Sequence, residues 1–172
     1  MDVFSSIVRA LLCAIAIVIG GGAGAASARE VVGFSGAAEP GTIVVRTSER
    51  RLYLVIGAGQ ALRYPVAVGR QGKQWFGEAA VSGKHLRPAW SPPEEVRQDH
   101  PNLPSVIPGG APNNPMGVAA LTLSGGEYAI HGTNRPESIG KFVSYGCIRM
   151  HNRDIADLFG RVNVGTPVVV RP

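Results

Sequence analysis

The sequence has few cysteines, few aromatic residues and no basic run interleaved with aromatics. Its two cysteines are Cys13, inside an apolar stretch near the N-terminus, and Cys147. Aromatic residues make up only 6% of the chain, and the lack of a basic run rich in aromatics argues against a nucleic-acid partner. The 23 glycines and 13 prolines exclude a chain built mostly of long helices and favour many short elements joined by turns.

The N-terminal stretch has the three parts of a secretory signal peptide. Arg9 precedes an apolar run over residues 10–19, and Ala26-Ser27-Ala28 forms an A-x-A processing site. The unbroken apolar run is much shorter than the roughly 20 residues that a spanning helix needs, so we favour cleavage after Ala28 over an uncleaved membrane anchor. We therefore expect a protein exported to the periplasm or cell envelope, with residues 1–28 as signal peptide and no transmembrane helix after processing.

Removal of this segment leaves Cys147 as the single thiol. One thiol cannot form an internal disulfide in an oxidising compartment. Cys147 is then either a small buried hydrophobe, the usual fate of a lone cysteine, or a free thiol kept for chemistry. The net charge of +5 survives the cleavage and suits a polyanionic envelope or a carboxylate-bearing substrate, but it equally suits a merely soluble surface.

One domain over residues 41–172 accounts for the rest of the chain, preceded by a flexible tether at 29–40 that lacks periodicity. Three β-rich runs predict an antiparallel meander, and two more predict a hairpin that ends at His131. A short strand at 79–81 and a strand within 162–170 complete the expected sheet. The five runs lie at residues 43–45, 52–56, 61–68, 118–123 and 128–131.

Two short helices are expected outside the sheet. One starts with Pro93 in its first turn and runs through Gln98. The other runs from an N-cap at Asn152 to Phe159, with Gly160 as C-cap. The proline-rich segment 100–115 predicts a surface loop bordering a cleft. The predicted fold is mainly β, a β-sandwich or open barrel with two short helices.

The stretch from His131 to Met150 holds a candidate nucleophile and a candidate base. A thiol attacks a carbonyl only as the thiolate, and His131, fixed at a strand end, is the best-placed base for Cys147. Gly146 permits a tight turn beside the nucleophile, and we expect the N–H groups of Tyr145, Gly146 and Cys147 to form an oxyanion hole.

Arg149 shares a face with Cys147 if the segment is extended. Its guanidinium is then placed to clamp a substrate carboxylate. The alternative is a surface arginine, or an ion pair with Glu137 or Asp154, and spacing alone does not choose between these.

A metal site formed by Cys147, His131 and His151 is the main alternative chemistry. The spacing tolerates it, but zinc sites normally show clearer paired ligands, so we expect neither a metal nor a cofactor. Trp75, Trp90 and Tyr128 are expected to be packing aromatics rather than substrate platforms. For Trp90, which is set among prolines, the alternative role is to form the wall of a cleft.

His131-Gly132, together with the run SYGCIRM over residues 144–150, resembles the signature of the L,D-transpeptidase catalytic-domain family, bacterial cell-wall enzymes with a cysteine nucleophile. Further matching stretches are Tyr64–Arg70, Asn114–Gly117 and Val164–Val168. The resemblance therefore spans about residues 41–172, and it implies the mainly β fold of this family.

The resemblance also implies a reaction. Cys147 would attack the L,D bond before the terminal D-alanine of a peptidoglycan tetrapeptide stem, forming a thioester that an amine resolves. The product is a crosslink or an envelope protein attached to the wall. By the same resemblance His131 is the base, the Gly132 carbonyl orients it, Ser144 and Arg149 shape the substrate site, and carbapenems acylate Cys147.

One position departs from the family pattern. Many members carry a second histidine where this chain has Tyr145, and a phenol cannot serve as a base at neutral pH. The role of Tyr145 stays open, with packing or a hydrogen bond as the alternatives. Two other functions also remain: an L,D-carboxypeptidase that uses water as acceptor, and a wall-binding module without turnover.

Overall fold

The computed structural model describes residues 29–172, and the predicted signal peptide lies outside the described residues. The described part is mainly β, as predicted, with ten strands, two α-helices and one 3₁₀ helix. Within this part no helix is long and apolar enough to cross a membrane.

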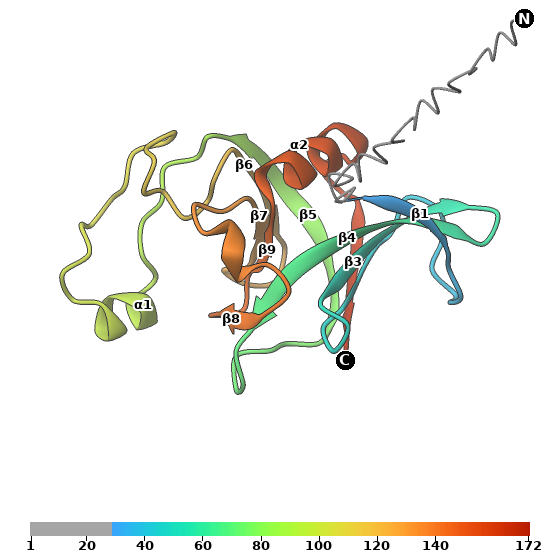
Figure 1. Ribbon diagram of the computed structural model, residues 1–172, viewed down its shortest axis with the longest axis horizontal. Coiled ribbons are helices and arrows are strands. Elements are labelled where there is room, and N and C mark those ends of the chain that lie inside the picture. The colour runs from blue at the N-terminus through green and yellow to red at the C-terminus, as the bar shows by residue number, and fades with distance from the viewer. Residues whose placement is uncertain (1–28) are drawn as a thin grey trace, which may run out of the picture.

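The strands form one sheet in the order β1-β4-β3-β2-β10-β5-β6-β7-β9. The long strand β4 pairs with β3 through its first half and with β9 near its end, so the sheet closes on itself like a barrel. Figure 1 shows β4 running from β1 to β8. The strands are β1 (Glu30–Gly33), β2 (Ile43–Arg46), β3 (Arg51–Gly57), β4 (Gln60–Gly69), β5 (Gly77–Leu86), β6 (Ala119–Leu123), β7 (Ala129–His131), β8 (Phe142–Ser144), β9 (Ile148–Met150) and β10 (Pro167–Arg171).

The main core lies inside the closed sheet, where alternate residues of the strands are buried. Helix α2 (Asn152–Arg161) packs Ile155 and Leu158 into it, and both side chains are fully buried. The predicted meander of β2, β3 and β4 and the predicted hairpin of β6 and β7 are present, all with antiparallel pairing.

The predicted flexible tether at 29–40 is wrong for part of its length. Residues 30–33 form β1, which pairs antiparallel with β4. Val32, Phe34 and Ala38 cover a second, smaller core on the outer face of the sheet. The segment lacks a period because it contributes only a few apolar contacts to an already formed sheet.

Several predicted boundaries also need correction. Strand β5 extends well beyond 79–81. The last predicted strand is present as β10, which begins at Pro167 and pairs in parallel with β2. In α2 the N-cap is His151, and the helix continues through Gly160 to Arg161. Asn152 is not the cap because its side-chain Oδ1 accepts hydrogen bonds from the backbone of Val118 and Thr133 instead.

A long excursion, residues 87–118, leaves the sheet between β5 and β6 and carries α1 (Glu94–Asp99) (Figure 1). Asn114, only 1% exposed, joins the two ends of the excursion near the sheet. The amide Nδ2 donates to the carbonyls of Pro88 and Pro108, each at 2.9 Å. The predicted loop 100–115 lies in this excursion, and its residues 110–112 and 114 line a cavity of about 320 Å³.

Candidate active site

Cys147 lies in the turn between β8 and β9, partly exposed and without a disulfide partner among the described residues. It lines two cavities, of about 550 and 420 Å³. Pro93 and Glu94, at the start of α1, line both cavities on the opposite side. The thiol is therefore reached through a cleft between the sheet and the excursion.

His131 ends β7, as predicted, and its ring is hydrogen-bonded to the backbone at both Gly132 and Pro115. Nδ1 lies 2.7 Å from the carbonyl oxygen of Gly132. Because a carbonyl only accepts, Nδ1 carries the proton in this bond and the basic lone pair of the neutral ring is on Nε2. The side chain is 4% exposed. Burial, and secondarily the charge of Arg149, lower the pKa of His131 to about 4, so the resting imidazole is neutral at pH 7.

The pairing of β7 with β9 brings the base to the strand that follows the nucleophile. The two strands are parallel, with Ile130 opposite Ile148 and His131 opposite Arg149. Gly132 lies at a close approach in the same region: a Cβ there would overlap Asn152 Oδ1 and lie 3.1 Å from the carbonyl oxygen of Met116.

The turn that holds Cys147 is stabilised by Ser144, which is 1% exposed. Its hydroxyl donates to the carbonyl of Cys147 at 2.6 Å and accepts from the N–H of Gly146 at 3.1 Å. The Gly146 N–H is therefore already bonded, which corrects the expected three-donor oxyanion hole. The N–H groups of Tyr145 and Cys147 are the two that remain as candidates.

An aromatic pair supports the other side of this turn. Trp75 and Tyr128 stack with ring centroids 5.0 Å apart and an interplanar angle of 3°. Trp75 Nε1 also donates to the Gly146 carbonyl at 3.0 Å. Both aromatics pack against the main core. Trp90 lines the larger cavity, so its alternative as a cleft wall fits the structure.

Tyr145 turns toward α1 and forms what we call the α1 clasp, in which Arg70, Lys73 and Tyr145 hold Glu95 and Asp99. Its hydroxyl donates to Asp99 at 2.5 Å, and the Arg70 guanidinium lies 4.1 Å from its ring centroid. Arg70 donates to Asp99 at 3.0 Å, and Lys73 pairs with Glu95 at 2.6 Å. Tyr145 therefore joins the nucleophile's turn to the wall of the cleft.

Arg149 is a largely buried cation whose Nε has no hydrogen-bond partner among the described residues. The proposed ion pair with Asp154 is not formed, since the salt bridge of Asp154 is to Arg153 at 3.7 Å. Burial lowers the pKa of Arg149, but a guanidinium stays charged at neutral pH. The guanidinium is thus available for an anionic group that enters the site.

The thiol of Cys147 rests in its protonated form. Burial raises its pKa, while the Ala129 backbone N–H and the Arg149 charge act in the opposite direction. Because the pKa of His131 is lowered at the same time, the resting pair is a neutral thiol and a neutral imidazole. A thiolate at Cys147 therefore forms only if a base takes the thiol proton.

The alternative metal site of Cys147, His131 and His151 is not formed by the described residues. Among residues 29–172, no three His, Cys, Asp or Glu side chains gather in a way that could hold a metal ion. His151 caps α2 and lines a different cavity, together with Thr133 and Asn134.

The predicted contact between His131 and the Gly132 carbonyl is present, but sequence reasoning missed the residues that support this region. Nothing in the spacing of the sequence indicates that Asn114 and Asn152 join segments far apart in the chain. The α1 clasp was equally invisible, because its members come from three separate segments. Gly146, next to Cys147, was the one local sign of the close approach of the Tyr128 ring.

Comparison with known proteins points to one family. A profile of the L,D-transpeptidase catalytic domain matches residues 40–170. The chain is 40% identical over 135 residues to the probable L,D-transpeptidase YbiS of Escherichia coli K12, covering 73% of this chain and 43% of that protein. It is also 40% identical over 137 residues to the probable L,D-transpeptidase ErfK/SrfK of Salmonella typhimurium, covering 74% and 43%.

Solved structures show the same fold. An L,D-transpeptidase from Mycobacterium smegmatis has a TM-score of 0.61 at 17% identity, covering 76% of this chain and 58% of that one. The catalytic domain of the Enterococcus faecium L,D-transpeptidase acylated by ertapenem has a TM-score of 0.59 at 21% identity, covering 79% and 100%. The chain spans less than half the length of the curated relatives it matches.

Proposed function

The chain belongs to the L,D-transpeptidase catalytic-domain family, and on that premise we propose that it is a peptidoglycan L,D-transpeptidase of the periplasm or cell envelope with Cys147 as nucleophile. The observation that carries the proposal is the buried imidazole of His131, whose Nδ1 is fixed by the Gly132 carbonyl. The register of β7 and β9, with His131 opposite Arg149, two residues after the only thiol of the described residues, supports the pairing of this base with Cys147.

In the first half-reaction the carbonyl of the L,D bond in a tetrapeptide stem reaches the thiol. His131 Nε2 takes the thiol proton while the sulfur bonds to the carbonyl carbon. The tetrahedral intermediate then collapses, the C–N bond to D-alanine breaks, and the imidazolium returns the proton to the departing amine. A thioester on Cys147 and free D-alanine result.

In the second half-reaction a neutral amine attacks the thioester carbonyl and passes one proton to His131. The C–S bond breaks and the thiolate takes that proton back, which restores the resting pair. If the amine belongs to another stem the product is a crosslink, and if it belongs to an envelope protein that protein is attached to the wall. Water as acceptor would make the protein an L,D-carboxypeptidase.

Arg149 supplies the positive charge that this sequence of steps needs. A neutral thiol and a neutral imidazole must separate charge when the proton moves, and a nearby guanidinium stabilises the thiolate that forms. The same cation is placed to bind a carboxylate of the donor stem. An unpaired buried Nε supports such a role, because a natural partner for it would arrive with the substrate.

The test uses muropeptides that contain tetrapeptide stems, with D-alanine release and new dimers followed by mass spectrometry. We expect both from the wild-type protein and neither from Cys147→Ala, with Cys147→Ser as the isosteric variant that keeps the shape of the turn. Thermal unfolding of the variants verifies that they are folded. Activity retained by Cys147→Ala would exclude the thiolate mechanism.

The products separate transfer from hydrolysis. Release of D-alanine with tripeptide as the sole product identifies a carboxypeptidase, and no release at all favours a wall-binding module. A carbapenem should give a covalent adduct on Cys147, seen as a mass shift that Cys147→Ala lacks.

A further inference from the structure

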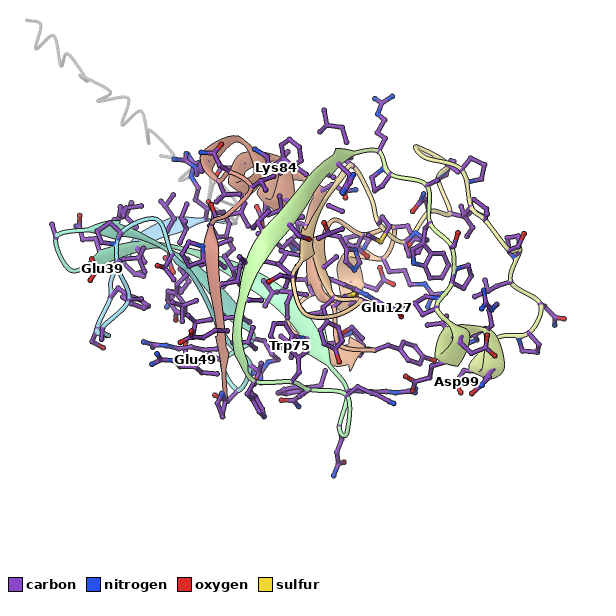
Figure 2. The ribbon with its side chains drawn as sticks, turned by 180° about the vertical axis from the view of Figure 1, so that it is seen from behind. Glu39, Glu49, Trp75, Lys84, Asp99 and Glu127 are labelled. Carbon is purple, nitrogen blue, oxygen red and sulfur yellow. The ribbon has the colours of Figure 1, made fainter. Side chains whose placement is uncertain are left out.

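Glu127 places an unpaired negative charge beside the nucleophile. It lies in the exposed turn between β6 and β7 and lines both cavities that contain Cys147. Figure 2 shows it between the sheet and the helix that carries Asp99. Within residues 29–172 its carboxylate has no hydrogen-bond or ion-pair partner.

The neighbouring acidic residues are different because each is neutralised. Glu94 pairs with Arg97 at 2.7 Å. Glu95 and Asp99 are held in the α1 clasp by Lys73 and Arg70. Glu127 is therefore the carboxylate of this cleft that is left for a ligand.

The smaller cavity, of about 420 Å³, contains the thiol, and the charged side chains that line it are all acidic. They are Glu94, Glu95 and Glu127. Arg149 is half-buried in β9 and lines neither of the two cavities that contain Cys147. Since Glu94 and Glu95 are paired with Arg97 and Lys73, Glu127 gives the smaller cavity its uncompensated negative charge.

We propose that Glu127 determines acceptor specificity by binding the ammonium group of a cationic amine in the smaller cavity. This inference rests on the proposed transpeptidase function and names the class of acceptor that the site prefers. A primary alkyl amine is protonated at neutral pH, so it arrives as a cation. It loses one proton to solvent at the open mouth of the cavity before the neutral amine attacks the thioester.

The charge of Glu127 suits the second half-reaction and not the first. Glu127 raises the pKa of the Cys147 thiol, which opposes formation of the thiolate. After acylation the sulfur carries no charge, so that penalty disappears while attraction to an incoming ammonium remains. The position of the Glu127 carboxylate beside Cys147 is thus explained if the acceptor ammonium binds to it after the thioester has formed.

The experiment measures acceptor KM separately from donor KM. The donor is a disaccharide tetrapeptide, and the acceptors are Nα-acetyl-lysine amide, which is cationic, and O-methylhydroxylamine, which is uncharged at neutral pH. In Glu127→Gln we expect KM for the lysine amide to rise about fivefold, the size of one partly screened ion pair. KM for O-methylhydroxylamine should not change, and D-alanine release should be retained or rise.

Glu39→Gln is the matched control, since Glu39 is an exposed glutamate at the opposite end of the molecule (Figure 2). It should leave both acceptor KM values unchanged. An unchanged KM for the lysine amide in Glu127→Gln, an equal rise for both amines, or a rise in donor KM would each overturn the proposal.

A binding measurement tests the same inference without turnover. Nα-acetyl-lysine amide is titrated into Cys147→Ala, and the amide resonances of Gly125 and Gly126, which line the cavity, are followed by NMR. We expect shifts that Glu127→Gln weakens and that the Nε-acetylated ligand does not produce. If wild-type protein releases no D-alanine, the proposed function fails, but this titration still decides the role of Glu127: shifts independent of Glu127 would overturn it.

Discussion

Replacing Gly146 by alanine tests how rigidly the turn of the nucleophile is supported. The backbone at Gly146 has φ +122°, a region that L side chains rarely adopt. An added Cβ would overlap Cε1 of Tyr128 and lie 2.9 Å from its Cδ1. The ring cannot easily retreat, because it stacks on Trp75, whose indole is itself bonded to the Gly146 carbonyl.

The expected cost has a backbone part and a steric part. A non-glycine residue in such a conformation costs roughly 1–3 kcal/mol, and overpacking adds roughly 1–3 kcal/mol more. We therefore expect Gly146→Ala to lower the free energy of unfolding by about 4 kcal/mol. Urea unfolding followed by tryptophan fluorescence measures it, since Trp75 is part of the disturbed pair.

Gly165→Ala is the control for the backbone part. Gly165 also has a positive φ, +92°, but a Cβ there meets nothing within 4 Å. This variant should lose about 2 kcal/mol. If Gly146→Ala loses no more than Gly165→Ala, the aromatic pair yields without cost and the turn is not rigidly supported.

Two further predictions concern the base and the cleft wall. Because the pKa of His131 is about 4 in the folded protein and about 6.5 when unfolded, its contribution to stability is fully present above pH 6.5 and is lost as pH falls toward 4, by about 3 kcal/mol in all. Urea titrations at several pH values should show this slope in the wild type and a smaller one in His131→Gln, and an equal slope in both would contradict the assignment. Tyr145→Phe removes the bond to Asp99 and should speed hydrogen exchange of the His100 amide, at the end of α1, about fivefold. Tyr53→Phe, which removes a similar bond to Glu49 far from the site, should not do so, and equal exchange in the two variants would mean that the α1 clasp does not depend on Tyr145.

The parts of the fold that could be predicted from the sequence are those set by local pattern. The three runs of the meander and the hairpin that ends at His131 have neighbouring partners, so alternation and turn residues are sufficient to define them. The pairing of β10 with β2 and of β7 with β9 is parallel and joins distant segments. No local signal specifies such pairing, which is why the closure of the sheet was not foreseen.

The site divides in the same way. Residues 144–150 around Cys147 form one continuous motif, and Gly132 directly follows His131. The resemblance to the family was therefore sufficient to predict these residues as parts of the site. Asn152 shows the opposite case: its position before a helix predicted a cap, but the side chain serves Val118 and Thr133. A tertiary demand for an acceptor at that point outweighed the local preference.

Tyr145 is the position that departs from the family pattern, and its contacts in the structure are structural and not those of a base. Its hydroxyl is directed at Asp99, while its backbone remains next to Cys147. The residue thus links the turn of the nucleophile to the wall that contributes Glu94 to both cavities. With no second imidazole at this point, the proposed mechanism uses His131 in both half-reactions. In that proposal the positive charge of Arg149 favours thiolate formation and donor binding, and the exposed Glu127 favours arrival of the acceptor once the thioester has formed.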